Sequence, residues 1–161
     1  YSFQMIKIQN ISGLYKITSS QHVDAKLDKV WDYYSRPTNL ESITPKSLSF
    51  KILNNPIEEM KEGDIIKFKM RLLPLINISW VTEIKTLKPL KYFVDEQKIG
   101  PYKLWHHRHS FEANRFGTTI TDEIHFALPL KFISNILYTL FIKKKLKEIF
   151  EYRNKTITNL L

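Results

Sequence analysis

Cysteine is absent from the 161-residue chain, and glycine occurs only 4 times. Without cysteine the protein has no disulfides, no thiolate nucleophile and no cysteine-ligated zinc site. The few glycines form neither a G-x-G-x-x-G fingerprint nor a Walker phosphate loop, and G-x-S-x-G and H-E-x-x-H motifs are missing as well. These absences exclude dinucleotide-binding and P-loop folds, nucleophile-elbow hydrolases and H-E-x-x-H metalloproteases.

Long apolar runs are missing too, since no stretch reaches the roughly 18 residues of a membrane-spanning helix. The start of the chain also lacks the basic, apolar and small-residue segments of a signal peptide. We therefore expect a cytoplasmic protein of a microbe. Met5 is a plausible initiator, so residues 1–4 are treated as a cloning remnant and residues 5–161 as a single domain.

The chain carries 25 basic against 16 acidic residues, a formal net charge of +9. Such an excess favours an anionic partner, either nucleic acid or a membrane surface. Nucleic acid is not expected, because the basic residues are scattered and no stacked-aromatic RNA motif is present. The densest basic group is interpreted either as a solvated helix face or as a transient contact with anionic lipid: Lys143, Lys144, Lys145 and Lys147.

Apolar periodicity predicts an α+β fold. A short strand at 14–20 leads into a helix that is capped by Asp24 or its neighbour, and a second short helix begins at Pro37. The first helix has an apolar stripe with helical spacing: Leu27, Val30, Trp31 and Tyr34. Period-two alternation then predicts antiparallel strands at 47–53, 66–72, 76–84 and 92–97.

The last two strands are predicted to form a hairpin around a four-residue loop, 114–117, which pairs Ala113 with Thr118. In this register His109 faces Asp122 and Trp105 faces Phe126. One face of the hairpin is then apolar apart from two histidines and an aspartate, and the other face is polar. A slip by one residue would destroy both groupings, which favours this register.

A long amphipathic helix is predicted from 132 to about 160, with an apolar stripe formed by Ile133, Ile136, Leu137, Leu140, Leu146, Ile149 and Phe150. It is expected to lie across the concave face of the sheet. The expected order is therefore a strand, two short helices, six more strands and a closing helix. A strongly bent sheet of about seven strands around one helix is expected to enclose a cavity.

This order and several local motifs resemble the START-like helix-grip superfamily, which includes lipid-binding and polyketide cyclase/dehydrase-like proteins. The resemblance extends from about Tyr15 to Arg153 and is closest to a bacterial branch of uncharacterised function. It implies a hydrophobic ligand held between sheet and helix, and it supports binding better than catalysis. The motifs that carry it are Val23-Asp24-Ala25, Val30-Trp31, Asn39-Leu40, Ile43-Thr44-Pro45, Val94-Asp95-Glu96-Gln97, Gly100-Pro101-Tyr102, Trp105-His106-His107-Arg108-His109, Phe111-Glu112 and Ile149-Phe150-Glu151-Tyr152-Arg153.

Large apolar side chains on the predicted inner face are interpreted as plain core and, in a fold with a cavity, also as its lining: Phe68, Met70, Trp80, Trp105, Phe111 and Phe126. Tyr102 is expected at the cavity mouth. Among Asp95, Glu96 and Gln97 the alternation does not identify the inward-facing residue. Whichever faces inward would anchor a polar group of the ligand or would bond within the sheet.

Three interpretations of the predicted His107, His109 and Asp122 group stay open. Asp122 and His109 form a buried structural pair, or a proton-transfer dyad, or part of a metal site with His107. The leading hypothesis is a binding or transfer protein for an elongated or polycyclic hydrophobic molecule or lipid, with polar contacts from these three residues. The alternatives are a cyclase or dehydratase that uses a His109/Asp122 dyad and an interaction protein that docks through its basic helix. No metal or other cofactor is expected.

Overall fold

The computed structural model describes residues 5–54, 58–73, 76–129 and 141–161. Eight strands form one antiparallel sheet in the order β1-β2-β8-β7-β6-β5-β4-β3, so β2 pairs with the last strand along the chain. The strands are β1 (Met5–Ile11), β2 (Leu14–Val23), β3 (Lys51–Ile52), β4 (Ile65–Leu73), β5 (Ile76–Lys88), β6 (Tyr92–Ile99), β7 (Leu104–Asn114) and β8 (Gly117–Ala127).

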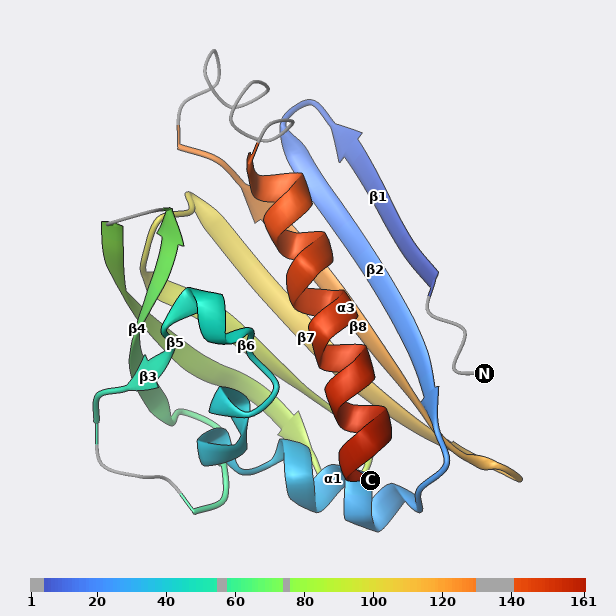
Figure 1. Ribbon diagram of the computed structural model, residues 1–161. Helices are drawn as coiled ribbons and strands as arrows, with labels where there is room; N and C mark the ends of the chain where they lie inside the picture. Colours follow the sequence, from blue (N-terminus) through green and yellow to red (C-terminus); the bar gives the residue numbers. More distant parts are fainter. Residues whose placement is uncertain (1–4, 55–57, 74–75, 130–140) are drawn as a thin grey trace.

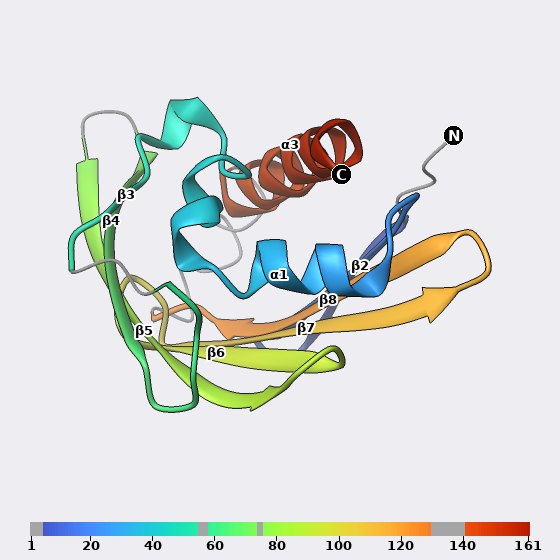
Figure 2. The same cartoon turned by 90° about the horizontal axis from the view of Figure 1, so that it is seen from below.

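The helices gather on one side of this sheet (Figure 1). Helix α1 (Leu27–Tyr34) is followed by the short 3-10 helices η1 (Pro37–Glu41) and η2 (Lys46–Leu48), and α3 (Lys143–Leu160) closes the chain. Seen from below, α1 and α3 lie above the concave face, and the β3–β5 side of the sheet curves up beside them (Figure 2). This curvature leaves a space between sheet and helices that side chains line. Within the described residues, no helix has the length and apolar character needed to cross a membrane.

The predicted apolar stripe of α1 is confirmed, because Val30, Trp31 and Tyr34 are buried. The expected cap at Asp24 or its neighbour is wrong: Lys26 precedes the helix, and its side chain makes no capping hydrogen bond. Asp24 and Ala25 instead form a bend after β2, and the hydroxyl of Thr118 donates a 2.8 Å hydrogen bond to the carbonyl of Ala25. This bond ties the bend to β8, so the helix begins only after it.

The sheet has eight strands where about seven were expected. The additional strand is β1, an edge strand paired with β2 from Met5↔Ser20 to Ile11↔Leu14. The strand expected at 47–53 is shortened to Lys51–Ile52, because Lys46–Leu48 form a 3-10 turn and Ser49 adopts a left-handed conformation with φ 46°. The two predicted short helices are present as α1 and η1, and η2 is a third helical segment that was not predicted.

The predicted β7–β8 register is confirmed at every expected pair, including Trp105↔Phe126 and His109↔Asp122. The connecting loop is shorter than predicted, since Asn114 pairs with Gly117 and only Arg115 and Phe116 form the turn. A two-residue turn gives the same pairing as the predicted four-residue loop, so the assignment of inner and outer faces is unchanged.

Helix α3 packs on the β2–β8 side of the sheet. Leu146 and Phe150 are buried there beside Tyr15 and Phe126, whose rings stack with centroids 5.0 Å apart. Of the predicted apolar stripe, Leu146 and Phe150 are therefore confirmed as buried, and Ile149 is half-buried. The expected helical positions 132–140, with Ile133, Ile136, Leu137 and Leu140, lie outside the described residues.

Candidate ligand cavity and buried His–Asp cluster

A cavity of about 160 Å³ lies between the sheet and the helices. Its size is close to that of a dry protein cavity that accepts one benzene-sized molecule. Most of its walls are apolar, and the polar groups that line it include Thr82, Asp95, His107, His109 and Arg153. The predicted lining residues that do face it are Phe68, Met70, Trp80, Tyr102, Trp105, His107 and His109.

Aromatic rings form one wall of the cavity because their strands pair directly. Phe68 on β4 is opposite Trp80 on β5, and the two rings stack with centroids 5.6 Å apart. Trp105 meets Trp80 edge-on at 5.2 Å. Tyr102 is held beside them by Gln97, whose side-chain amide donates a 2.7 Å hydrogen bond to the Tyr102 carbonyl. The wall is therefore fixed by pairing and by backbone contacts.

Three residues that were expected to line the cavity lie elsewhere. Phe111 packs against Trp31 and Tyr34 in the core beneath α1. Phe126 lies in the cluster under α3, and Asp122 lies behind the two histidines rather than on the cavity surface. Phe111 and Phe126 are therefore core residues rather than part of a binding surface.

Several lining residues were not singled out from the sequence as a binding surface. Tyr34 on α1, Ile43 between the 3-10 helices, Leu48 on η2 and Arg153 on α3 all face the cavity. The burial of Tyr34 could be read from its helical spacing. The position of Arg153 could not, because it depends on how α3 lies over the sheet.

The question left open at 95–97 is answered by β6. Asp95 lines the cavity, whereas Glu96 faces away and contacts His106 at 2.9 Å on the solvent side. Gln97 binds the backbone of Tyr102. The alternation of β6 is regular here, since Phe93 and Asp95 both face the cavity and pair directly with His109 and His107. The sequence left the facing open because Phe93 and Val94 are both apolar, and both are buried.

Asp95, His107, His109 and Asp122 form a buried cluster across β6, β7 and β8. Asp95 is the direct partner of His107, and Asp122 is the direct partner of His109. His107 Nε2 lies 2.9 Å from Asp122 Oδ1, and His109 Nε2 lies 3.1 Å from Asp95 Oδ2. His109 Nδ1 also contacts Asp122 Oδ1 at 2.8 Å, and the two imidazole rings are 3.7 Å apart. Each histidine is thus placed between two carboxylates.

The cluster shifts the proton affinities of its members in opposite directions. Burial alone would raise the pKa of Asp122, but hydrogen bonds and charges from both histidines outweigh it and hold that pKa far below its ordinary value. Burial would likewise lower the pKa of His109, but Asp122 and Asp95 outweigh it and raise that pKa. The pKa of His107 is lowered by burial and by the charge of its neighbour His109. Of the two histidines, His109 is therefore the more readily protonated.

Three further buried groups face the cavity with donors that have no hydrogen-bond partner among the described residues: the Tyr34 hydroxyl, Trp80 Nε1 and Arg153 Nε. Arg153 is nevertheless close to Asp122, with Nη1 3.8 Å from Oδ1. Buried donors are normally paired, so unpaired ones at a cavity indicate where a polar group of a ligand would bind.

Comparison with known proteins gives similarity in structure but not in sequence. No known family's sequence model matches the chain, and no curated protein sequence matches it. Protein Ms6760 from Mycobacterium smegmatis has a similar structure, with a TM-score of 0.68 at 13% identity over 100% of both chains. The ginseng major latex-like protein 151 from Panax ginseng gives a TM-score of 0.66 at 10% identity, over 91% of this chain and 97% of the other.

A third similar structure is part of a larger protein. The nucleoside-diphosphate sugar epimerase from Corynebacterium glutamicum matches at 22% identity with a TM-score of 0.64. The match covers 88% of this chain but only 28% of the epimerase chain. At identities this low, the structural similarity establishes the architecture alone. Together with the sheet, the closing helix and the short helix described above, they show that the chain has a helix-grip fold.

Proposed function

We propose that the protein binds a small hydrophobic molecule that carries one polar group, in the cavity between the sheet and α3. One observation carries this proposal: an apolar cavity of about 160 Å³ has three buried donors, from Tyr34, Trp80 and Arg153, without protein partners among the described residues. Apolar walls with a few converging polar groups are typical of small-molecule sites. The START-like resemblance of the sequence points to the same class of ligand.

The size of the cavity bears on the shape of the ligand. At about 160 Å³ the cavity suits a molecule of one aromatic ring, whereas pockets for drug-sized ligands are roughly 300–1,000 Å³. The elongated or polycyclic ligand expected from the sequence would need the cavity to enlarge. We therefore place a single-ring molecule first, with a carboxylate or carbonyl directed at Arg153 and Tyr34.

Native mass spectrometry of gently purified protein tests the proposal, together with titration of single-ring aromatic carboxylic acids. We expect either a discrete excess mass that organic solvent releases, or saturable binding of one such acid. Ile43→Phe should abolish this binding, because Ile43 lines the cavity and a larger ring would fill it. Leu90→Phe is the matched control at an exposed position. A bare chain mass combined with no saturable binding, or equal binding by both variants, would contradict the proposal.

The cyclase or dehydratase alternative stays a prediction. A general base needs one imidazole nitrogen directed at its substrate, whereas both nitrogens of His109 contact carboxylates. This geometry favours binding over proton transfer. His109→Gln and Asp122→Asn separate the two: turnover that disappears while binding survives would favour the enzyme.

We also propose a cytoplasmic location. A further part of the proposal is a transient contact with an anionic membrane through α3. Lys143, Lys144 and Lys147 are exposed on α3, but Lys145 and Lys147 pair with Glu148 and Glu151. The remaining positive charge, on Lys143 and Lys144, lies at the first turn of the helix, where it would contact anionic lipid.

A further inference from the structure

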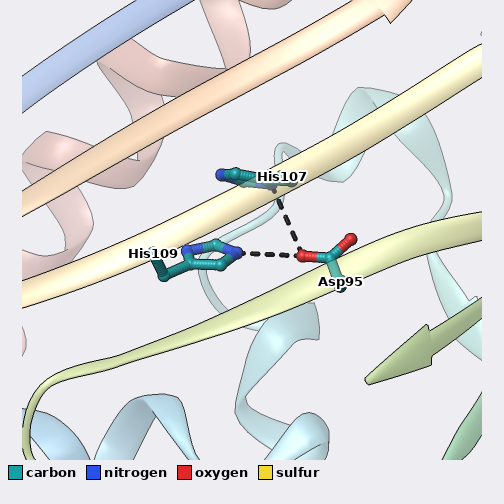
Figure 3. Close-up of side chains that lie close together, drawn as sticks. All are labelled: Asp95, His107 and His109. Carbon is teal, nitrogen blue, oxygen red and sulfur yellow. Dashed lines mark hydrogen bonds and ion pairs between the residues drawn. The ribbon is translucent and has the colours of Figure 1, made fainter. Parts of the chain in front are cut away.

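We propose that Asp95, His107 and His109 bind a divalent transition-metal ion such as Zn²⁺ at the cavity wall. The three side chains come from adjacent strands and converge on one point (Figure 3). One ligand atom from each lies within 4.8 Å of the others, and both histidines are buried. Two histidines and one carboxylate are a common ligand set for zinc and for non-haem iron.

The two distances from the Asp95 carboxylate to the histidine nitrogens are close to those of a metal site. Asp95 Oδ2 lies 3.1 Å from His109 Nε2 and 3.6 Å from His107 Nδ1. Bonds of about 2.0–2.2 Å to zinc imply separations of roughly 3–3.5 Å between neighbouring ligand atoms. Small side-chain rotations would therefore complete the coordination, without movement of the strands.

Asp122 supplies the outer support that metal-bound histidines require. A histidine that binds a metal through one nitrogen usually donates its other N–H to a carboxylate. His107 Nε2 donates such a bond to Asp122 Oδ1 at 2.9 Å, and His109 Nδ1 contacts the same oxygen at 2.8 Å. One carboxylate thus faces the outer nitrogen of both histidines.

A metal ion would replace one proton of the buried cluster. Without metal, His109 Nε2 donates a hydrogen bond to Asp95 Oδ2 at 3.1 Å. A divalent ion would take the place of that proton, and the remaining proton of His109 would lie on Nδ1, which faces Asp122 Oδ1 at 2.8 Å. His107 Nδ1, His109 Nε2 and Asp95 Oδ2 would then all present lone pairs to the bound cation.

The surroundings permit an open coordination position. All three ligands line the cavity, so a fourth position faces the space between sheet and helix. Arg153 lies nearest to the outer carboxylate, with Nη1 3.8 Å from Asp122. With both histidines neutral, the two carboxylates, Arg153 and the metal leave one net positive charge. That charge favours an anionic or carbonyl oxygen as the fourth ligand.

The assignment differs from the metal interpretation made from the sequence, which used Asp122 as the third ligand. Asp95 could not be identified there, because the apolar pair Phe93 and Val94 leaves the inner face of its strand undefined in the sequence. The proposal is independent of the cavity ligand, since metal binding is measured with the ion alone.

The test is calorimetric titration of Zn²⁺ into chelator-treated protein, combined with visible absorption after titration of Co²⁺. We expect a stoichiometric site whose cobalt spectrum shows d–d bands of nitrogen and oxygen ligation. Asp95→Asn, His107→Gln and His109→Gln should each weaken Zn²⁺ binding at least about tenfold. Asp122→Asn should weaken it by roughly 10–100-fold, as is typical for loss of an outer partner.

His106→Gln is the matched control, because His106 lies on the same strand directly before His107 but faces solvent beside Glu96. It should leave Zn²⁺ affinity and the cobalt spectrum unchanged. If wild-type protein shows no stoichiometric site and no d–d bands, the proposal is wrong whatever the variants do. It is also wrong if His106→Gln removes the site, since the metal would then be bound at the surface.

Discussion

His107 Nε2 and Asp122 Oδ1 are joined by a buried 2.9 Å hydrogen bond, although the two residues are diagonal rather than direct neighbours on β7 and β8. The direct partner of Asp122 is His109, and its 2.8 Å contact is not aligned as a hydrogen bond. One carboxylate therefore contacts two residues of the facing strand, so its removal should disturb both.

Asp122→Asn should destabilise the protein by roughly 3 kcal/mol at neutral pH, because breaking a buried ionic group leaves its partners uncompensated. Chemical denaturation of chelator-treated protein measures this. Glu123→Gln is the control on the next position of β8, where the half-exposed pair with Lys16 is worth at most about 1 kcal/mol. Equal losses in the two variants would show that the buried cluster contributes nothing of its own.

The contribution of Asp122 should depend on pH in a defined direction. Its pKa in the folded protein is lowered, so its stabilisation is fully present above the unfolded value of about 3.9 and is lost as pH falls toward the folded value. We expect the stability difference between wild type and Asp122→Asn to be large near neutral pH and to shrink below about pH 4. Denaturation curves across this range check the prediction, which a pH-independent difference would refute.

Tyr34→Phe should not destabilise the free protein, because the buried Tyr34 hydroxyl has no hydrogen-bond partner among the described residues. Tyr33→Phe is the neighbouring control, since the Tyr33 hydroxyl bonds to Ser42 and its loss should cost about 1 kcal/mol. If Tyr34 binds the polar group of the ligand, Tyr34→Phe should also weaken ligand binding. Thermal unfolding and ligand titration measure the two effects separately.

Gly117→Ala should be strongly destabilising. A Cβ atom there would lie 2.2 Å from the carbonyl oxygen of Val23, and the residue has φ +140°. Gly13→Ala separates the two causes, because φ is +89° but nothing lies within 4 Å of the added atom. We expect about 1 kcal/mol for Gly13→Ala from backbone strain and a clearly larger loss for Gly117→Ala. Similar losses would mean that the chain near Val23 moves aside easily.

Replacement of the four helix lysines by Gln (Lys143, Lys144, Lys145 and Lys147) should reduce binding to vesicles that contain anionic lipid, and salt should weaken the wild-type binding. A control variant with the same charge change uses exposed lysines of β3, β4 and β5: Lys51, Lys67, Lys69 and Lys85. Co-sedimentation measures both. Equal loss in the two variants would indicate a general charge effect rather than a contact through α3.

Local patterns in the sequence predicted the parts of the fold that depend on neighbours along the chain. The turn after Asn114 and the alternation on both sides of it were sufficient to pair His109 with Asp122. Strand β1 was not recognised because it lies at an edge, where alternation buries little: Ile11 at its end is 73% exposed. Edge strands need less apolar surface and therefore leave a weaker pattern.

Part of the candidate site could be predicted from the same local alternation. Six of the seven expected lining residues sit on strands whose inner face follows from alternation, and Tyr102 lies in the loop before β7. The facing of Asp95 was left open because the preceding residues Phe93 and Val94 are both apolar, and both are buried. The place of Arg153 depends on the packing of α3, which no local period encodes.

The pairing of β2 with β8 has a consequence for synthesis of the chain. Leu14 pairs with Ala127 at one end of this ladder and Val23 with Thr118 at the other, so well over half of the chain separates the partners. During translation the β1–β2 ribbon is made long before β8, and until then one of its edges stays unpaired. Such distant contacts slow folding and expose strand edges to aggregation. The β1–β2 hairpin should therefore need protection until β8 has been synthesised.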